Sequence, residues 1–170
     1  MELLVKHIIK KKLGGLLLKT IIPIFVLCLS LWYPVDTSYG AGESECRLFE
    51  NLFADHVKQT GKICKVEVSR KNLNVSVEGV KVSPELAGLS LNADFERTEN
   101  TTIVLGEFAL LPQEVNPVID ALRKGGIQVS ALHNHWFEKP MVLYLHFQGK
   151  GETETLAQTV KSAIDVVQQK

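Results

Sequence analysis

Two consecutive runs in which apolar and polar side chains alternate predict a pair of adjacent strands near the end of the chain. The runs are residues 127–136 and 141–149, and residues 137–140 join them. Successive side chains of a strand point to opposite faces of its sheet. One face of the second run is apolar throughout and predicts the buried side of a sheet, whereas the other face is mixed. The apolar positions are Met141, Leu143, Leu145 and Phe147, and the mixed positions are Val142, Tyr144, His146 and Gln148.

Helical spacing replaces this alternation in three other segments. Apolar side chains recur every three or four residues in 46–59, 115–122 and 156–167, which predicts three amphipathic helices. Asn116-Pro117 offers a capping side chain followed by proline, so we expect the second helix to begin there. Glu114 would then lie just outside the helix, where its carboxylate is free to face a neighbouring site.

Further strands are expected between the first two helices. Residues 63–68 and 73–80 are rich in valine and predict a hairpin or two consecutive strands, with Arg70-Lys71-Asn72 between them. Residues 86–95 fit a short strand or a loop, and residues 101–111 fit a strand in which Gly106 indicates a bulge or a close backbone approach. The order of elements predicts an α+β fold, a mainly antiparallel sheet of about five to six strands with about three helices packed on it.

The first 41 residues have the composition of a targeting segment. Five lysines precede an apolar run over residues 21–32, and small residues follow it near 38–42. We therefore expect residues 1–41 to form a signal peptide, or else an N-terminal membrane anchor. Residues 42–170 would form a single exported domain, extracellular or associated with the cell envelope. Leu27, before Cys28, does not fit a lipid-attachment signal, which requires a small residue at that position.

Charge and cysteine content narrow the choice of partners. Residues 42–170 carry three more acidic than basic side chains. Because nucleic acids are bound by clustered basic surfaces, we expect no nucleic-acid partner, and membrane contact only through an uncleaved N-terminal segment. Cys46 and Cys64 would form one disulfide in an oxidising compartment, and the alternative is two separate, partly buried thiols.

The histidines of the predicted strand pair form the candidate site. His133 and His135 share one face of the first strand, and His146 belongs to the mixed face of the second. Three imidazoles on one patch suit a divalent transition metal such as zinc or copper. An acidic residue would complete the ligand set or act as a general base, and the candidates are Glu107, Glu114 and Glu138. Alternatively, the histidines bind a small polar ligand without metal, or only stabilise the hairpin through hydrogen bonds.

Several blocks of the sequence resemble one known family. They are Leu105 to Val118 with its Glu-Val-Asn-Pro motif, Gly125-Gly126-Ile127, the Ala-Leu-His-Asn-His-Trp motif from Ala131, Tyr144-Leu-His146, and the stretch from Arg70 to Phe95. By these blocks the chain resembles the DUF1259 family, also called the LppY/LpqO family, over residues 46–167. The resemblance implies an exported or envelope-associated domain of unknown function. Its recurrent polar residues would be Arg70, Glu107, Glu114, Asn116, His133, Asn134, His135 and His146, whereas Asn72 and Glu107 stand where aspartate is common.

Two functions follow from these observations. The first is an exported envelope domain that binds a transition metal or a small polar ligand through His133, His135 and His146. If this domain is an enzyme, the residues support metal-assisted hydrolysis, with Glu114 or Glu107 as the base and Arg70 binding an anionic group. The second is a non-catalytic cell-wall accessory or binding module whose histidines are structural. In either case the expected partner is a small molecule or a component of the envelope.

Overall fold

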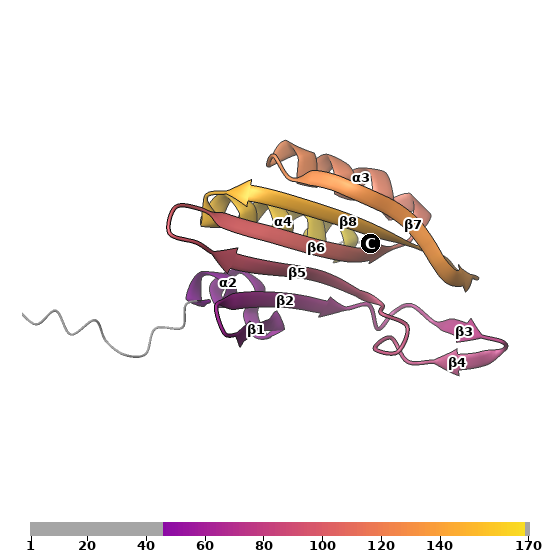
Figure 1. Cartoon of the computed structure of the whole chain (residues 1–170). Helices are drawn as coiled ribbons and strands as arrows, with labels where there is room; N and C mark the ends of the chain where they lie inside the picture. The colour runs from indigo at the N-terminus through magenta and orange to yellow at the C-terminus, as the bar shows by residue number, and fades with distance from the viewer. Residues whose placement is uncertain (1–45, 169–170) are drawn as a thin grey trace, which may run out of the picture. The chain divides into compact units, whose positions relative to one another are not determined.

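The computed structural model describes residues 46–168 apart from the side chain of Glu138. These residues form a six-stranded antiparallel sheet, a two-stranded sheet and three α-helices, which confirms the predicted α+β fold (Figure 1). The predicted leader, residues 1–41 with Cys28, lies outside the described residues. Within residues 46–168, no helix is both long enough and apolar enough to cross a membrane.

The main sheet has the two strands of the candidate site at one side. In spatial order its strands are β1 (Val57–Thr60), β2 (Ile63–Ser69), β5 (Ser90–Arg97), β6 (Thr102–Leu110), β8 (Met141–Gly151) and β7 (Gln128–Glu138). Each strand is antiparallel to its neighbours. β7 and β8 form the hairpin that the alternating pattern predicts, and β7 is an edge strand of the sheet.

Three helices cover one face of this sheet. They are α2 (Arg47–Phe53), α3 (Pro112–Lys124) and α4 (Thr153–Gln168), and their buried side chains form one hydrophobic core with those of the strands. Figure 1 shows α3 and α4 behind the sheet, so that the opposite face of the strands is turned toward the viewer. We call that opposite face the open face.

A separate excursion covers one end of the open face. It runs from Arg70 to Leu89 and contains the two-stranded sheet of β3 (Val75–Val77) and β4 (Val80–Val82). Apolar side chains of the excursion form a second, smaller core with side chains of β6, β7 and β8. Its buried members are Leu73, Val75, Ala87, Leu89, Ala109, Phe137, Val142 and Tyr144. Val142 and Tyr144 are therefore buried, although the sequence assigns them to a mixed face.

Three local predictions about the chain before β5 need correction or confirmation. The first helix ends at Phe53 rather than near residue 59, because Ala54 takes a positive φ of 53° and a 3-10 turn then leads into β1. Of the two alternatives for residues 63–80, the hairpin across Arg70-Lys71-Asn72 is wrong, since β2 pairs with β1 and β5 and β3 pairs with β4, and the two consecutive strands are confirmed as β2 and β3. The disulfide prediction is confirmed, and the bond joins Cys46, just before α2, to Cys64 in β2.

Further outcomes concern the second half of the chain. α3 begins at Pro112 and not at Asn116, so that Glu114 lies in its first turn and Pro117 lies inside the helix. Gly106 confirms the predicted close approach, because a Cβ atom there would collide with the ring of Phe147. Met141 was expected in the core but is 46% exposed at the end of the hairpin.

Candidate functional site

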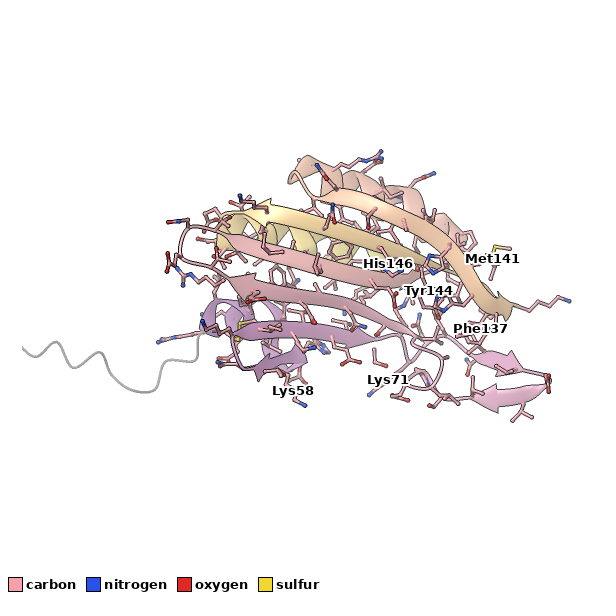
Figure 2. All side chains as sticks on the ribbon, viewed as in Figure 1. Lys58, Lys71, Phe137, Met141, Tyr144 and His146 are labelled. Atoms are coloured by element: carbon pink, nitrogen blue, oxygen red, sulfur yellow. A yellow bond between two sulfur atoms is a disulfide. The ribbon has the colours of Figure 1, made fainter. Side chains whose placement is uncertain are left out.

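The three histidines of the β7–β8 hairpin lie together on the open face. His133 is paired in register with Tyr144, and Ala131 with His146, so that His146 lies diagonally across from His133. Side-chain alternation then directs His133, His135 and His146 to the same side of the sheet. Figure 2 shows His146 and Tyr144 next to each other along β8, on the face turned toward the viewer.

Close contacts join these histidines to one carboxylate. Nε2 of His133 lies 3.0 Å from Nε2 of His135, and Nε2 of His146 lies 3.1 Å from Oε2 of Glu107. The rings of His133 and His146 stack with an interplanar angle of 9° and a centroid distance of 5.0 Å. Glu107 reaches this position because it is paired in register with His146 across β6 and β8. We call His133, His135, His146 and Glu107 the histidine cluster.

Tyr144 forms a rigid platform under the cluster. Its ring stacks on His135 with a centroid distance of 3.6 Å and an interplanar angle of 10°. The hydroxyl donates a hydrogen bond of 2.8 Å to the carbonyl oxygen of Ala87, in the excursion. Burial, with a smaller contribution from the negative charge of Glu107, raises the pKa of Tyr144 to about 12. The hydroxyl therefore remains a donor at neutral pH, and the hydrogen bond fixes the plane against which His135 packs.

The environment of His135 favours its neutral form. Burial lowers the pKa of His135 from its ordinary value, and electrostatic interactions with His133 and His146 act in the same direction, whereas Glu107 opposes them. Its Nδ1 atom is buried and has no hydrogen-bond partner among the described residues. An unpaired buried ring nitrogen is unfavourable, and a ligand or a water molecule would relieve that cost. A neutral imidazole is also the form that coordinates a metal.

Arg70 and Glu114 lie outside the histidine cluster. Both are buried, and they form a two-pronged ion pair in which Nη1 of Arg70 lies 2.9 Å from Oε2 of Glu114 and Nη2 lies 3.0 Å from Oε1. Arg70 also donates to the carbonyl oxygen of Ala109, and Glu114 accepts the backbone N–H of Leu111 at 2.8 Å. The expectation that the Glu114 carboxylate is free to face a site is therefore wrong. Of the acidic residues named from the sequence, the structure brings Glu107 to the histidines.

The cluster is not preformed around a single metal position. Among residues 46–168, no group of three or more histidine, cysteine, aspartate or glutamate side chains is already arranged to hold a metal ion. The contact distances of 3.0 Å and 3.1 Å within its two pairs are nonetheless close to the spacing between ligands of one zinc ion. That spacing is roughly 3.3 Å for tetrahedral bonds of 2.0 to 2.1 Å. The rings would have to rotate from their present positions to direct three nitrogens at one point.

Sequence reasoning missed the polar surface beside the cluster. Asn92, Asp94 and Glu96 of β5 alternate with buried Leu91, Ala93 and Phe95, and Lys65 and Glu67 alternate similarly in β2. This alternation is visible in the sequence, but the partner of each strand was not. Because Glu67 pairs with Asn92, Asn92 with Glu107 and Glu107 with His146, the open face carries one continuous row of polar side chains that ends at the cluster.

Comparisons with known proteins give a family without an activity. Neither the curated proteins nor the solved structures contain a significant match to this chain. One family model, described as Domain of Unknown Function (DUF1259), matches residues 48–166 and so includes all four residues of the histidine cluster. The chain belongs to the DUF1259 family.

Proposed function

We propose that this domain binds a divalent transition metal of the zinc or copper class through His133, His135 and His146, with Glu107 as the fourth group. The observation that carries the proposal is the convergence of three imidazoles and one carboxylate in two close pairs on a rigid sheet. Imidazole nitrogen and carboxylate oxygen are common ligands of these ions. The stacked His133 and His146 rings bring the two pairs next to each other.

Metal binding would replace the contacts that the cluster makes without metal. The His133–His135 hydrogen bond and the His146–Glu107 contact would give way to metal–ligand bonds. The lowered pKa of His135 supports this exchange, because it favours the neutral ring, which need not release a proton before it coordinates. Glu107 would then serve as the fourth ligand or as a base for a metal-bound water molecule. Metal-assisted hydrolysis is the reaction class that such a site supports.

An exported location fits the same proposal. The Cys46–Cys64 disulfide is a bond that persists in oxidising compartments and is rare in the cytosol. The composition of residues 1–41 agrees with export through a signal peptide or an N-terminal anchor. In that compartment the domain would meet a small molecule or an envelope component as its ligand.

A second candidate function is a metal-free binding or accessory module of the cell envelope. It is favoured by the contacts that the histidines already make, since His133 bonds to His135, His146 contacts Glu107 and His135 stacks on Tyr144. In that case the three rings stabilise the hairpin, and recognition occurs elsewhere on the domain.

Titration calorimetry with Zn²⁺ and Cu²⁺ on the metal-free protein separates the two candidates. We expect one ion per chain, and a loss of affinity of at least about tenfold in each of His133→Ala and His146→Ala. His56→Ala is the matched control, because His56 is exposed in the 3-10 turn after α2 and makes no contact with the cluster. Absence of stoichiometric binding, or unchanged affinity in both cluster variants, would refute the proposed site.

A further inference from the structure

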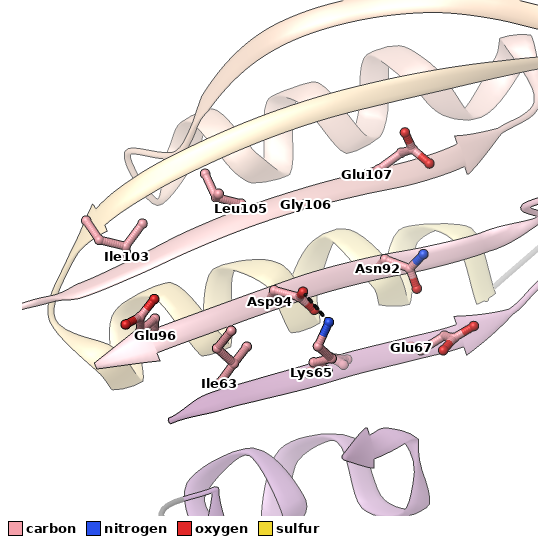
Figure 3. A pocket seen from close by; sticks show the side chains of 11 residues that line it. Ile63, Lys65, Glu67, Asn92, Asp94, Glu96, Ile103, Leu105, Gly106 and Glu107 are labelled. Carbon is pink, nitrogen blue, oxygen red and sulfur yellow. Dashed lines mark ion pairs between the residues drawn. The ribbon is translucent and has the colours of Figure 1, made fainter. Parts of the chain in front are cut away.

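The open face contains a hollow beside the histidine cluster. The hollow has a volume of about 480 Å³ and lies over β2, β5 and β6, with Glu107 of the cluster at its border (Figure 3). We propose that it is a second ligand site, for an elongated organic cation in which amino groups are carried on an aliphatic chain, as in the polyamines. This site goes beyond the proposed metal site, because its occupation requires no metal.

The size and floor of the hollow suit an extended small molecule. Ligand sites typically have volumes of roughly 300 to 1,000 Å³. Gly106 lets the ring of Phe147 pack directly against β6 from the core side, and Gly106 itself lines the hollow on the open face. Four apolar residues also line it, Ile63, Val66, Ile103 and Leu105, and of these Leu105 is 58% exposed in the middle of a polar face. Figure 3 shows Ile103 and Leu105 along β6 and Ile63 on β2. An aliphatic chain would cover this exposed apolar surface.

The charges that line the hollow are complementary to an organic cation. Only one ammonium group lines it, that of Lys65, against four carboxylates. The carboxylates belong to Glu67, Asp94, Glu96 and Glu107. Lys65 lies 3.0 Å from Asp94 and neutralises that carboxylate (Figure 3). Glu67 and Glu96 form no ion pair with any other described residue, so they retain their full attraction for a bound cation. Lys58 and Lys150 are register neighbours of lining residues but do not line the hollow themselves.

The spacing of the two unpaired carboxylates selects the length of the ligand. Glu67 is paired in register with Asn92, and Glu96 follows Asn92 by four residues along β5. Four residues of extended strand correspond to roughly 13 Å. The Lys65–Asp94 ion pair lies between these two carboxylates, and Leu105 lies beside Asp94 on β6. Two carboxylates at that separation match the amino groups at the two ends of an extended aliphatic triamine. A compact metal cation could contact only one of the two, so the arrangement favours a long organic cation.

The test is calorimetric titration of the full-length protein with spermidine, without added metal and at low salt. We expect saturable binding that weakens as the salt concentration rises. Glu67→Gln and Glu96→Gln should each reduce affinity by about fivefold or more, and Leu105→Ser by a smaller factor. Glu99→Gln is the matched control, because Glu99 is an exposed carboxylate of the β5–β6 loop outside the hollow, and it should leave the affinity unchanged. An uncharged diol of the same length should not bind.

Each remaining outcome bears on this proposal separately from the metal site. Retained spermidine binding in His146→Ala supports the hollow as an independent site, whether or not the wild-type protein binds zinc. No saturable binding, or equal losses in Glu67→Gln and Glu99→Gln, would overturn the proposal. A lysine-rich peptide that binds at least ten times more tightly than spermidine would also overturn it, because the natural occupant would then be a protein segment.

Discussion

Removal of the Glu114 carboxylate should destabilise the domain more than any substitution in the histidine cluster. In Glu114→Ala, Arg70 would keep its charge at 4% exposure, having lost two hydrogen bonds of 2.9 and 3.0 Å, and the N–H of Leu111 would lose its acceptor. Breaking a buried ion pair by deleting one partner costs about 3 to 5 kcal/mol. The unpaired amide would contribute about 1 kcal/mol or more, although the two costs overlap because one side chain serves both partners. We expect a total loss of about 4 kcal/mol in the free energy of unfolding.

The assay is urea unfolding followed by circular dichroism. The midpoint should fall while the slope m stays constant, since the surface exposed on unfolding does not change. Asp165→Ala is the control, because it breaks the partly exposed i,i+4 pair with Lys161 on α4 and should cost less than about 0.5 kcal/mol. The double variant Arg70→Met/Glu114→Leu should lose less than the sum of its single variants, as it leaves no unpaired buried charge. Equal losses in Glu114→Ala and Asp165→Ala would refute this account of the buried pair.

Three further predictions test the scaffold around the site. Reduction of the Cys46–Cys64 bond, which closes a loop with a sequence separation of 18, should lower the free energy of unfolding by about 3 kcal/mol, and urea titrations with and without reductant measure this. Gly106→Ala should destabilise the domain by about 1 to 3 kcal/mol, because Phe147 must move to admit the methyl group; an unchanged thermal midpoint would contradict the packing described. The raised pKa of Tyr144 means that the folded state holds the phenolic proton more tightly than the unfolded state does. The contribution of this proton to the free energy of unfolding is therefore complete below pH 10 and is lost as the pH rises toward about 12. Phenolate absorbance should report a transition there that Tyr144→Phe lacks.

The sequence could predict those elements whose pattern is local and regular. Alternation over residues 141–147 located the β7–β8 hairpin, and the spacing of apolar side chains located α4. The start of α3 was harder, since Pro112 and Pro117 both fit the first helical position. The choice between them depends on Glu114, whose carboxylate binds the Leu111 amide and Arg70 at the same time. A partner 44 residues away in the chain leaves no local signature.

The candidate site likewise has one part that follows from a local sequence pattern and another that depends on contacts between distant segments. His133, His135 and His146 share a face because of strand alternation, and this part followed from the sequence. The position of Glu107 depends on the pairing of β6 with β8, and the burial of Tyr144 depends on the excursion that crosses the open face. Both are consequences of contacts between distant segments. The hollow over β2, β5 and β6 likewise exists only once three strands are placed side by side.

The open face of the sheet, against which no helix of residues 46–168 packs, has a consequence for how this domain can evolve. All of the helices among residues 46–168 belong to the core on the other side, so His133, His146 and Glu107 contribute little to the burial that keeps the chain folded. Their replacement should leave the domain intact while ligand preference changes. Most proteins have a narrow stability margin, which limits how many substitutions in a functional site they can accept. Here most of the stability comes from the core between the helices and the sheet. Descendants of this chain could therefore acquire new ligands on the open face without prior compensating mutations in that core.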